Sequence, residues 1–209
     1  MNKTCKIILA VVLVLALIAI GYVCYNKVQE DKMGPVSFES FKKVEADGKV
    51  FMENKDIGLK FMVPEGWEVE NAPWASISVK TPDFIPFTNP SPLPKSGCLI
   101  NINPEIQIEG SKYDLQYTYY KQIIDDKEAL AGRNIGKEKC EIVELSGIKA
   151  VRDNTFIDSN VDNNGNYIYV AIPYNNIIYR FETYIFGQDK EKCLQNFDNL
   201  ITTISIKKK

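Results

Sequence analysis

The sequence predicts an α+β fold, in which an antiparallel sheet is flanked by helices and preceded by one N-terminal transmembrane helix. Three observations support this prediction. The stretch Ile7–Tyr25 is apolar, and its first fourteen residues carry no polar side chain. The middle of the chain alternates apolar and polar residues with the period of β-strands. The segment Asp189–Ile204 has the apolar spacing of an amphipathic helix.

The N-terminal stretch is long enough to cross a membrane. At a rise of about 1.5 Å per residue, a helix over Ile7–Tyr25 reaches about 28 Å, close to the ~30 Å hydrocarbon core of a bilayer. Lys3 and Lys6 precede it, and because positive residues stay cytoplasmic, the rest of the chain is expected outside. Signal-peptide cleavage before Tyr22 and lipidation at Cys24 are the alternatives that remain open.

The chain is expected to divide into an anchor (residues 1–25), a polar connector (26–49) and an extracytoplasmic α+β domain (50–209). Its formal net charge is −2. Nucleic acid is excluded as the main partner, because phosphate binding needs a basic surface. The expected partners are the membrane, through the helix, and a protein or another component of the cell envelope. The expected location is a single-pass protein of the cell membrane.

The sequence contains no histidine. This absence excludes Ser-His-Asp and Cys-His nucleophile systems and H-E-x-x-H zinc sites, and no cofactor or metal is expected. The five cysteines form no C-x-x-C pair, so zinc and thioredoxin-like sites are not indicated. Among Cys98, Cys140 and Cys193, two can form a disulfide outside the cytoplasm, or all three can be small buried residues. The pairing stays open.

Strands are predicted where alternating residues lie between turn signals. In Asp56–Glu70, Leu59, Phe61 and Val63 share one face of a half-buried strand. Pro104 is expected to separate two strands, because proline cannot donate to a sheet ladder. Two hairpins are expected further on, one across Ser146–Gly147 and one across Pro173–Asn176. The expected strands and helices of this part are Cys98–Asn103, Glu105–Ile108, Ser111–Ile124 (helix), Glu138–Leu145, Ile148–Phe156, Tyr167–Ile172, Ile177–Phe186 and Asp189–Ile204 (helix).

The strand and turn Gly58–Trp67, followed by a mid-chain helix, a run of hairpins and a closing helix, resembles the PsbP-like family over about Val50–Ile206. The resemblance implies an antiparallel sheet packed between helices. That family includes photosystem accessory subunits and anchored bacterial proteins without assigned activity. No residues match the photosystem-binding segments, so the resemblance implies architecture only.

A calcium-binding motif is incomplete. Asn160, Asp162, Asn164 and Gly165 match positions 1, 3, 5 and 6 of an EF-hand loop. The twelfth position is Ala171 instead of the glutamate that completes the calcium cage. Asn-Gly is also a strong tight-turn signal, so a loop between strands is favoured over a calcium site.

Catalytic motifs are also incomplete. Ser40–Lys43 and Ser146–Lys149 match S-x-x-K, but the S-D-N and K-T-G motifs of penicillin-recognising enzymes are missing. Three carboxylate pairs could serve a hydrolase only in a cleft that holds them about 5 to 10 Å apart. These pairs are Asp125 with Asp126, Glu68 with Glu70, and Glu141 with Glu144.

Aromatic residues around a proline-rich stretch provide the candidate contact site. Trp74, Phe84 and Phe87 are expected to contact a partner, because loops carry function disproportionately. The alternative, that Trp67 and Trp74 close one end of the core, remains open. The predicted function is therefore a membrane-anchored extracytoplasmic binding or accessory module of unknown ligand, non-enzymatic. The alternative function is an extracytoplasmic hydrolase that uses carboxylate residues.

Overall fold

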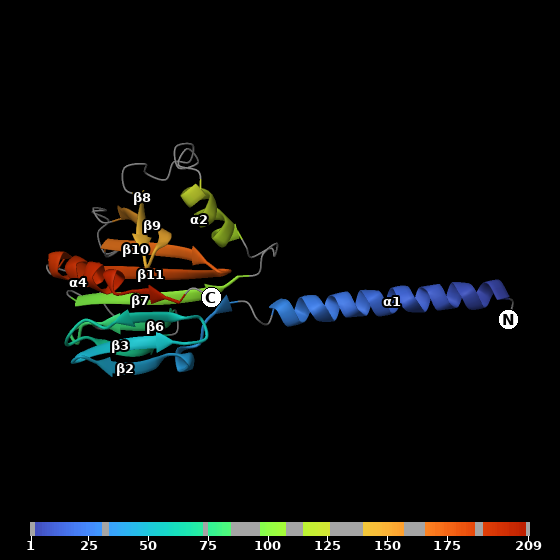
Figure 1. Ribbon diagram of the computed structural model, residues 1–209, viewed down its shortest axis with the longest axis horizontal. Coiled ribbons are helices and arrows are strands. Elements are labelled where there is room, and N and C mark those ends of the chain that lie inside the picture. Colours follow the sequence, from blue (N-terminus) through green and yellow to red (C-terminus); the bar gives the residue numbers. More distant parts are fainter. Residues whose placement is uncertain are drawn as a thin grey trace, which may run out of the picture. The chain divides into compact units, whose positions relative to one another are not determined.

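The computed structural model divides the chain into two units (Figure 1). The N-terminal unit, Met1–Gly34, contains helix α1 (Lys3–Glu30), and the folded unit comprises Pro35–Lys209. The residues that the structure describes are 3–30, 34–72, 75–84, 97–107, 115–125, 140–156, 166–186 and 190–207.

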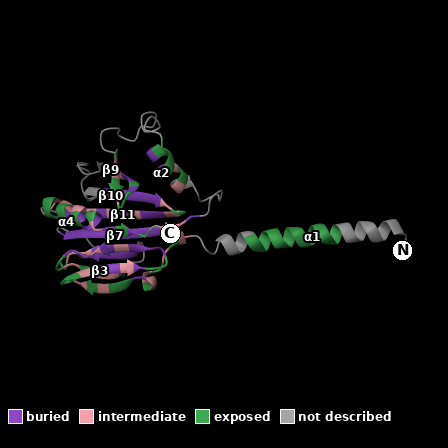
Figure 2. Cartoon of the chain, in the orientation of Figure 1, coloured by how far each residue is buried: buried purple, intermediate pink, exposed green. Residues whose placement is uncertain are grey.

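Helix α1 presents apolar side chains on every side. Over residues 12–25, where side-chain burial is described, every residue is exposed (Figure 2). The large apolar side chains of this stretch, from Val12 to Tyr25, are 55–67% exposed. Because 3.6 residues make one turn, these positions cover the whole circumference of the helix. Within the described residues, no helix meets the length and hydropathy needed to cross a membrane.

The folded unit is built from two antiparallel sheets and the helices α2 (Leu115–Asp125) and α4 (Lys190–Thr202). Sheet A has the strand order β5-β6-β7-β11-β10-β9-β8, and sheet B has the order β12-β4-β3-β2. The strands are β1 (Gly34–Pro35), β2 (Lys42–Ala46), β3 (Lys49–Asn54), β4 (Leu59–Met62), β5 (Glu68–Ala72), β6 (Ala75–Lys80), β7 (Gly97–Ile106), β8 (Cys140–Leu145), β9 (Ile148–Phe156), β10 (Asn166–Tyr174), β11 (Ile177–Phe186) and β12 (Ser205–Ile206), with a 3-10 turn η1 at Phe38–Ser40.

The main core lies between one face of sheet A and a layer formed by sheet B and α4. Alternate side chains of a strand point to opposite faces, so Ile102 and Phe181, which are directly opposite in β7 and β11, share this core. Phe61 of β4 meets Phe181 edge to face at 6.3 Å. Phe197 of α4 is fully buried in the same cluster.

The other face of sheet A is covered by α2. Tyr120 and Ile123 pack against Val151, Ala171 and Ile178, which come from β9, β10 and β11. Figure 2 accordingly shows the central strands as mostly buried. The expected antiparallel sheet flanked by helices is therefore confirmed at this level of detail.

Strand β7 continues through Pro104, so the predicted break between two strands is wrong. Pro104 lies opposite Tyr179 of β11, and its carbonyl accepts a hydrogen bond of 3.0 Å from the Val36 N–H. The nitrogen and oxygen of one strand residue face the same side, so the ring nitrogen faces away from β11 and removes no bond from that ladder. Pairing with β6 ends at Ile102, before the proline is reached.

The β10–β11 hairpin is tighter than predicted. Strand β10 runs to Tyr174, so the turn is Asn175–Asn176 and not Pro173–Asn176. Both asparagines have positive φ, 51° and 58°, which is the pattern of a type I′ turn and is tolerated best by Gly and Asn. The other hairpin turns at Ser146–Gly147, as predicted.

Residues 35–49, which the sequence assigns to a connector, belong to the folded unit. Phe41 is buried in the main core, and β2 pairs with β3 along its whole length. The closing helix ends at Thr202, before the expected Ile204, because Thr203 turns the chain towards β12. The Thr203 hydroxyl donates to the Leu200 carbonyl at 2.7 Å and accepts from the Met62 N–H at 2.9 Å.

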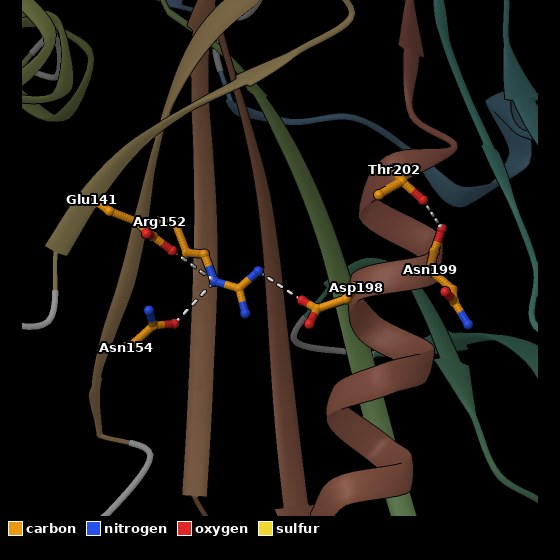
Figure 3. A network of polar contacts seen from close by, with 6 residues as sticks. All are labelled: Glu141, Arg152, Asn154, Asp198, Asn199 and Thr202. Atoms are coloured by element: carbon orange, nitrogen blue, oxygen red, sulfur yellow. Dashed lines mark hydrogen bonds and ion pairs between the residues drawn. The ribbon is translucent and has the colours of Figure 1, made fainter.

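A polar network joins β9 to α4 (Figure 3). Arg152 Nη1 donates to Asp198 Oδ1 at 2.6 Å, and Arg152 Nε donates to Asn154 Oδ1 at 3.0 Å. Glu141 Oε1 lies 3.5 Å from the same Nε. The Arg152 side chain is 19% exposed, so removing its carboxylate partners would leave a half-buried charge uncompensated. The network fastens α4 to the far strands of sheet A.

Phe197→Ala should lower the free energy of unfolding by about 3–5 kcal/mol, because it leaves a cavity in the main core. The measurement is urea unfolding of the full chain in non-ionic detergent, followed by circular dichroism. Gln195→Ala, on the exposed side of α4, is the control and should have little effect. A loss below about 1 kcal/mol for Phe197→Ala would show that this helix face does not stabilise the core.

Candidate functional site

A groove opens in the folded unit between the β2–β3 turn and the β4–β5 turn. Its volume is about 890 Å³, within the usual range of ligand pockets. Lys43 of β2 and Glu68 of β5 both line it. These strands are the last ones of sheet B and sheet A, so the groove lies between the open edges of the two sheets.

The floor of the groove is apolar. Val50, Val63, Val69 and Trp67 line it, and all four contact or belong to the main hydrophobic cluster. The Val63 N–H donates to the Val50 carbonyl at 2.8 Å, which holds the ends of β3 and β4 together. The Trp67 N–H donates to the Pro64 carbonyl at 3.1 Å and closes the turn that directs the indole towards the floor.

The turn before Trp67 depends on a glycine. Gly66 has a φ of 77°, a left-handed conformation that glycine adopts without steric cost. Its neighbour Pro64 fixes the start of the turn through its restricted φ. The sequence Pro-Glu-Gly-Trp therefore sets the position of the indole locally, as the sequence predicts for this turn.

Trp67 rests on a disulfide bond. Cys98 of β7 is bonded to Cys193 of α4, with a Cα–Cα distance of 5.7 Å. Trp67 and Leu194 pack against this buried pair. Of the pairings that the sequence leaves open, the structure contains Cys98–Cys193. The bond ties α4 to the start of β7, so the surface on which Trp67 packs is covalently fixed.

The two lips of the groove carry different charges. The β2–β3 lip has Lys43, Asp47 and Lys49, and Lys43 Nζ lies 3.4 Å from a Glu45 carboxylate oxygen. The other lip has Glu65 and Glu68, both exposed. Among the described residues, neither of these carboxylates has an ion-pair partner. This lip is therefore available to a cationic ligand group.

The aromatic residues predicted as contacts are placed only in part. Trp74 and Phe87 lie outside the described residues. Phe84 is 3% exposed and packs with Leu99 and Tyr184 on sheet A. Its ring therefore fills a small core and offers no exposed contact surface in the structure.

The candidate nucleophiles have structural hydrogen bonds. Ser40 Oγ donates to the Ser37 carbonyl and accepts from Asn54 Nδ2, both at 2.6 Å. Ser146 Oγ donates to the Ile204 carbonyl and links the β8–β9 turn to the end of α4. Both hydroxyls therefore support turns. The EF-hand-like residues 160–165 lie outside the described residues.

Each carboxylate pair noted in the sequence has one member in an ion pair. Among the described residues, no group of three or more His, Cys, Asp or Glu side chains is arranged to hold a metal ion. The three ion pairs are Lys80–Glu70 at 2.6 Å, Arg152–Glu141 at 3.5 Å and Lys121–Asp125 at 4.0 Å.

The sequence did not indicate that the Lys and Glu residues on the two lips belong to one groove. Lys43 entered only as the lysine of an S-x-x-K match and Glu68 only as a member of a carboxylate pair, while Lys49 and Glu65 matched no motif. Only the proximity of two turns that are separated in the sequence makes them one site. The one sequence feature that pointed to the groove was the Pro-Glu-Gly turn next to Trp67.

Replacing both bridged cysteines, as Cys98→Ala with Cys193→Ala, should lower the free energy of unfolding by about 2–5 kcal/mol. The bond closes a loop of 95 residues, so its loss increases the conformational freedom of the unfolded chain. Urea unfolding of the full chain in detergent measures the effect. Cys24→Ala is the control, since Cys24 is a free, exposed cysteine of α1. Equal stabilities of the double variant and this control would contradict the prediction.

Comparisons with protein-family models and with curated proteins found no match. Among solved structures, the chain is similar to cyanobacterial PsbP (CyanoP) from Synechocystis sp. PCC 6803, with 11% identity and a TM-score of 0.41, covering 80% of this chain and 93% of that one. A crystal structure from Bacteroides thetaiotaomicron VPI-5482 matches with 12% identity and a TM-score of 0.41, covering 73% of this chain and 46% of that one.

Proposed function

We propose that this protein is a membrane-anchored binding or accessory module, whose folded unit lies outside the cytoplasm and holds a ligand in the groove beside Trp67. The observation that carries the proposal is the exposed apolar surface of α1. A helix that is apolar all round is stable where it is buried, in a large core or in a membrane.

The exposed apolar surface of helix α1 is too large to be stable in water. Ten large apolar side chains between Val12 and Tyr25 are more than half exposed. Fully burying each such side chain is worth roughly 1.5–3 kcal/mol. The hydrocarbon core of a lipid bilayer is an environment that would accommodate these side chains.

The disulfide supports a location outside the cytoplasm. Disulfides persist in oxidising compartments and are rare in the reducing cytosol. Cys98–Cys193 is buried in the folded unit, and Lys3 and Lys6 at the start of the chain favour a cytoplasmic N-terminus. These two independent observations favour the same orientation.

The groove supports binding as the activity. It combines an apolar floor, an indole and charged lips, which is the usual composition of a recognition site. The alternative hydrolase has weaker support, because the carboxylate pairs on which it depends are engaged in ion pairs at Glu70, Glu141 and Asp125.

Leu15→Asp should release the full chain from membranes during alkaline carbonate extraction. A carboxylate at the centre of a spanning helix costs about 2.5–3.5 kcal/mol of insertion free energy. Leu15→Ile is the matched control and should remain in the membrane fraction. Retention of both variants in the membrane would contradict an anchor formed by α1.

Protease added to intact cells should digest the folded unit of the wild-type chain, because the proposed orientation places it outside. A cytoplasmic protein serves as the internal control and should stay intact until lysis. Complete protection of the folded unit before lysis would reverse the orientation.

A photo-reactive side chain placed at Lys49 or at Glu65, one on each lip of the groove, should give discrete crosslinked adducts in living cells. The matched control position is Glu144, which is also exposed but lies on β8 at the opposite edge of sheet A. Trp67→Ala should reduce the adducts at both lips, because it removes the largest apolar side chain of the floor. Equal labelling at all three positions would show that the groove is not a preferred site.

A further inference from the structure

We infer that the ligand of the groove is an extended polypeptide segment that adds as a strand to the outer edge of β5 and alternates apolar with basic side chains. This inference rests on the proposed function, because it names the ligand of the same groove. It follows from the strand edges, the side-chain alternation of β5 and the charges on its lip.

Two strand edges border the groove. Lys43 belongs to β2, and Glu68 and Val69 belong to β5. In the described part of the chain, no strand pairs with the outer edge of either. Such an edge presents a row of backbone N–H and C=O groups that can pair with another extended chain. A small molecule cannot satisfy a row of this kind.

The edge of β5 is better suited to pairing than the edge of β2. Strand β2 exposes Lys42, Lys43 and Glu45, and dense charge on an edge strand discourages the addition of another strand. Strand β5 pairs regularly with β6 from Glu68 to Glu70, and its register shifts only after Glu70. The regular part of this edge therefore begins beside Trp67.

The side chains of β5 alternate between the two faces of the sheet, so a strand added beside it would meet a different surface on each face. Val69 lies opposite Val79 of β6, which is buried in the main core, and Trp67 shares the groove floor with Val69. Every second side chain of an added strand would therefore lie over an apolar surface. These positions require apolar residues.

The remaining side chains of an added strand would lie beside carboxylates. Glu68 and Glu70 point to the other face of β5. Glu70 is neutralised by Lys80 at 2.6 Å, whereas Glu68 and the neighbouring Glu65 have no ion-pair partner in the described residues. Opposite charges on adjacent strands attract, so these positions favour Lys or Arg.

The probe for this inference is a fluorescent, end-capped octapeptide of alternating valine and lysine. Its binding to the full chain in non-ionic detergent is measured by fluorescence anisotropy. We expect it to bind at least about tenfold more tightly than the same peptide with glutamate in place of lysine, because only lysine is attracted to the acidic lip. Equal binding of the two peptides would overturn the charge assignment.

Glu68→Lys should reverse this preference, so that the valine–glutamate peptide binds more tightly. The matched control is Glu144→Lys, which makes the same change at an exposed site on β8, the other end strand of sheet A. This control should keep the preference of the wild type. A reversal in both variants, or in neither, would place the peptide away from β5.

Backbone pairing is tested with two N-methylated forms of the valine–lysine peptide, one methylated at odd and one at even positions. Because alternate N–H groups of a strand point to opposite sides, only one form loses the groups that face β5. We expect one form to lose binding and the other to retain it. Equal binding of both forms would refute strand addition.

The outcomes separate this inference from the proposed function. If the octapeptide fails to bind while the crosslinks at Lys49 and Glu65 persist in cells, the ligand class is wrong and the binding proposal stands. If those crosslinks are also absent, both are wrong. The assigned site would also be refuted if the valine–lysine peptide bound the double variant Trp67→Ala with Glu68→Lys as tightly as it binds the wild type.

Discussion

The unbroken pairing of β7 with β11 is the constraint on which the rest of the folded unit depends. Gly97–Ile106 lies opposite Phe186–Ile177 without a register shift. Since a slip of one residue would exchange the two faces of a strand, this register keeps Ile102 and Phe181 in the main core. It also keeps Ile178 under α2 on the other face. Both helical layers are therefore set by one ladder.

The candidate site depends on the same ladder through a short chain of contacts. Cys98, near the start of β7, is bonded to Cys193 of α4, and Trp67 packs on this bond. The indole in turn forms part of the groove floor. Because the disulfide cannot move independently of β7 or α4, the indole is held on a preorganised support. A preorganised surface lowers the entropic cost of binding.

The local parts of the fold were predictable from the sequence, and the long-range parts were not. The Ser146–Gly147 turn and the Phe61 strand followed from nearby residues. Pro104 was misread because its tolerance depends on Val36, far away in the sequence. Phe84 read as an exposed loop residue because nothing nearby indicates that Leu99 will cover it. The groove escaped prediction for the same reason, since its lips meet only after both sheets have formed.

The first residues of the folded unit lie near one end of β7, and the groove lies near the other end. The Val36 N–H bonds to Pro104 near one end of the strand, while Cys98 and Trp67 lie near the other. From Cys98 to Pro104 the strand spans about 20 Å at roughly 3.3 Å per residue. The folded unit begins at Pro35, beside the Val36 end of β7, whereas Trp67 packs near the Cys98 end. A polypeptide that pairs with β5 beside Trp67 would therefore contact the folded unit near the end of β7 opposite to Val36.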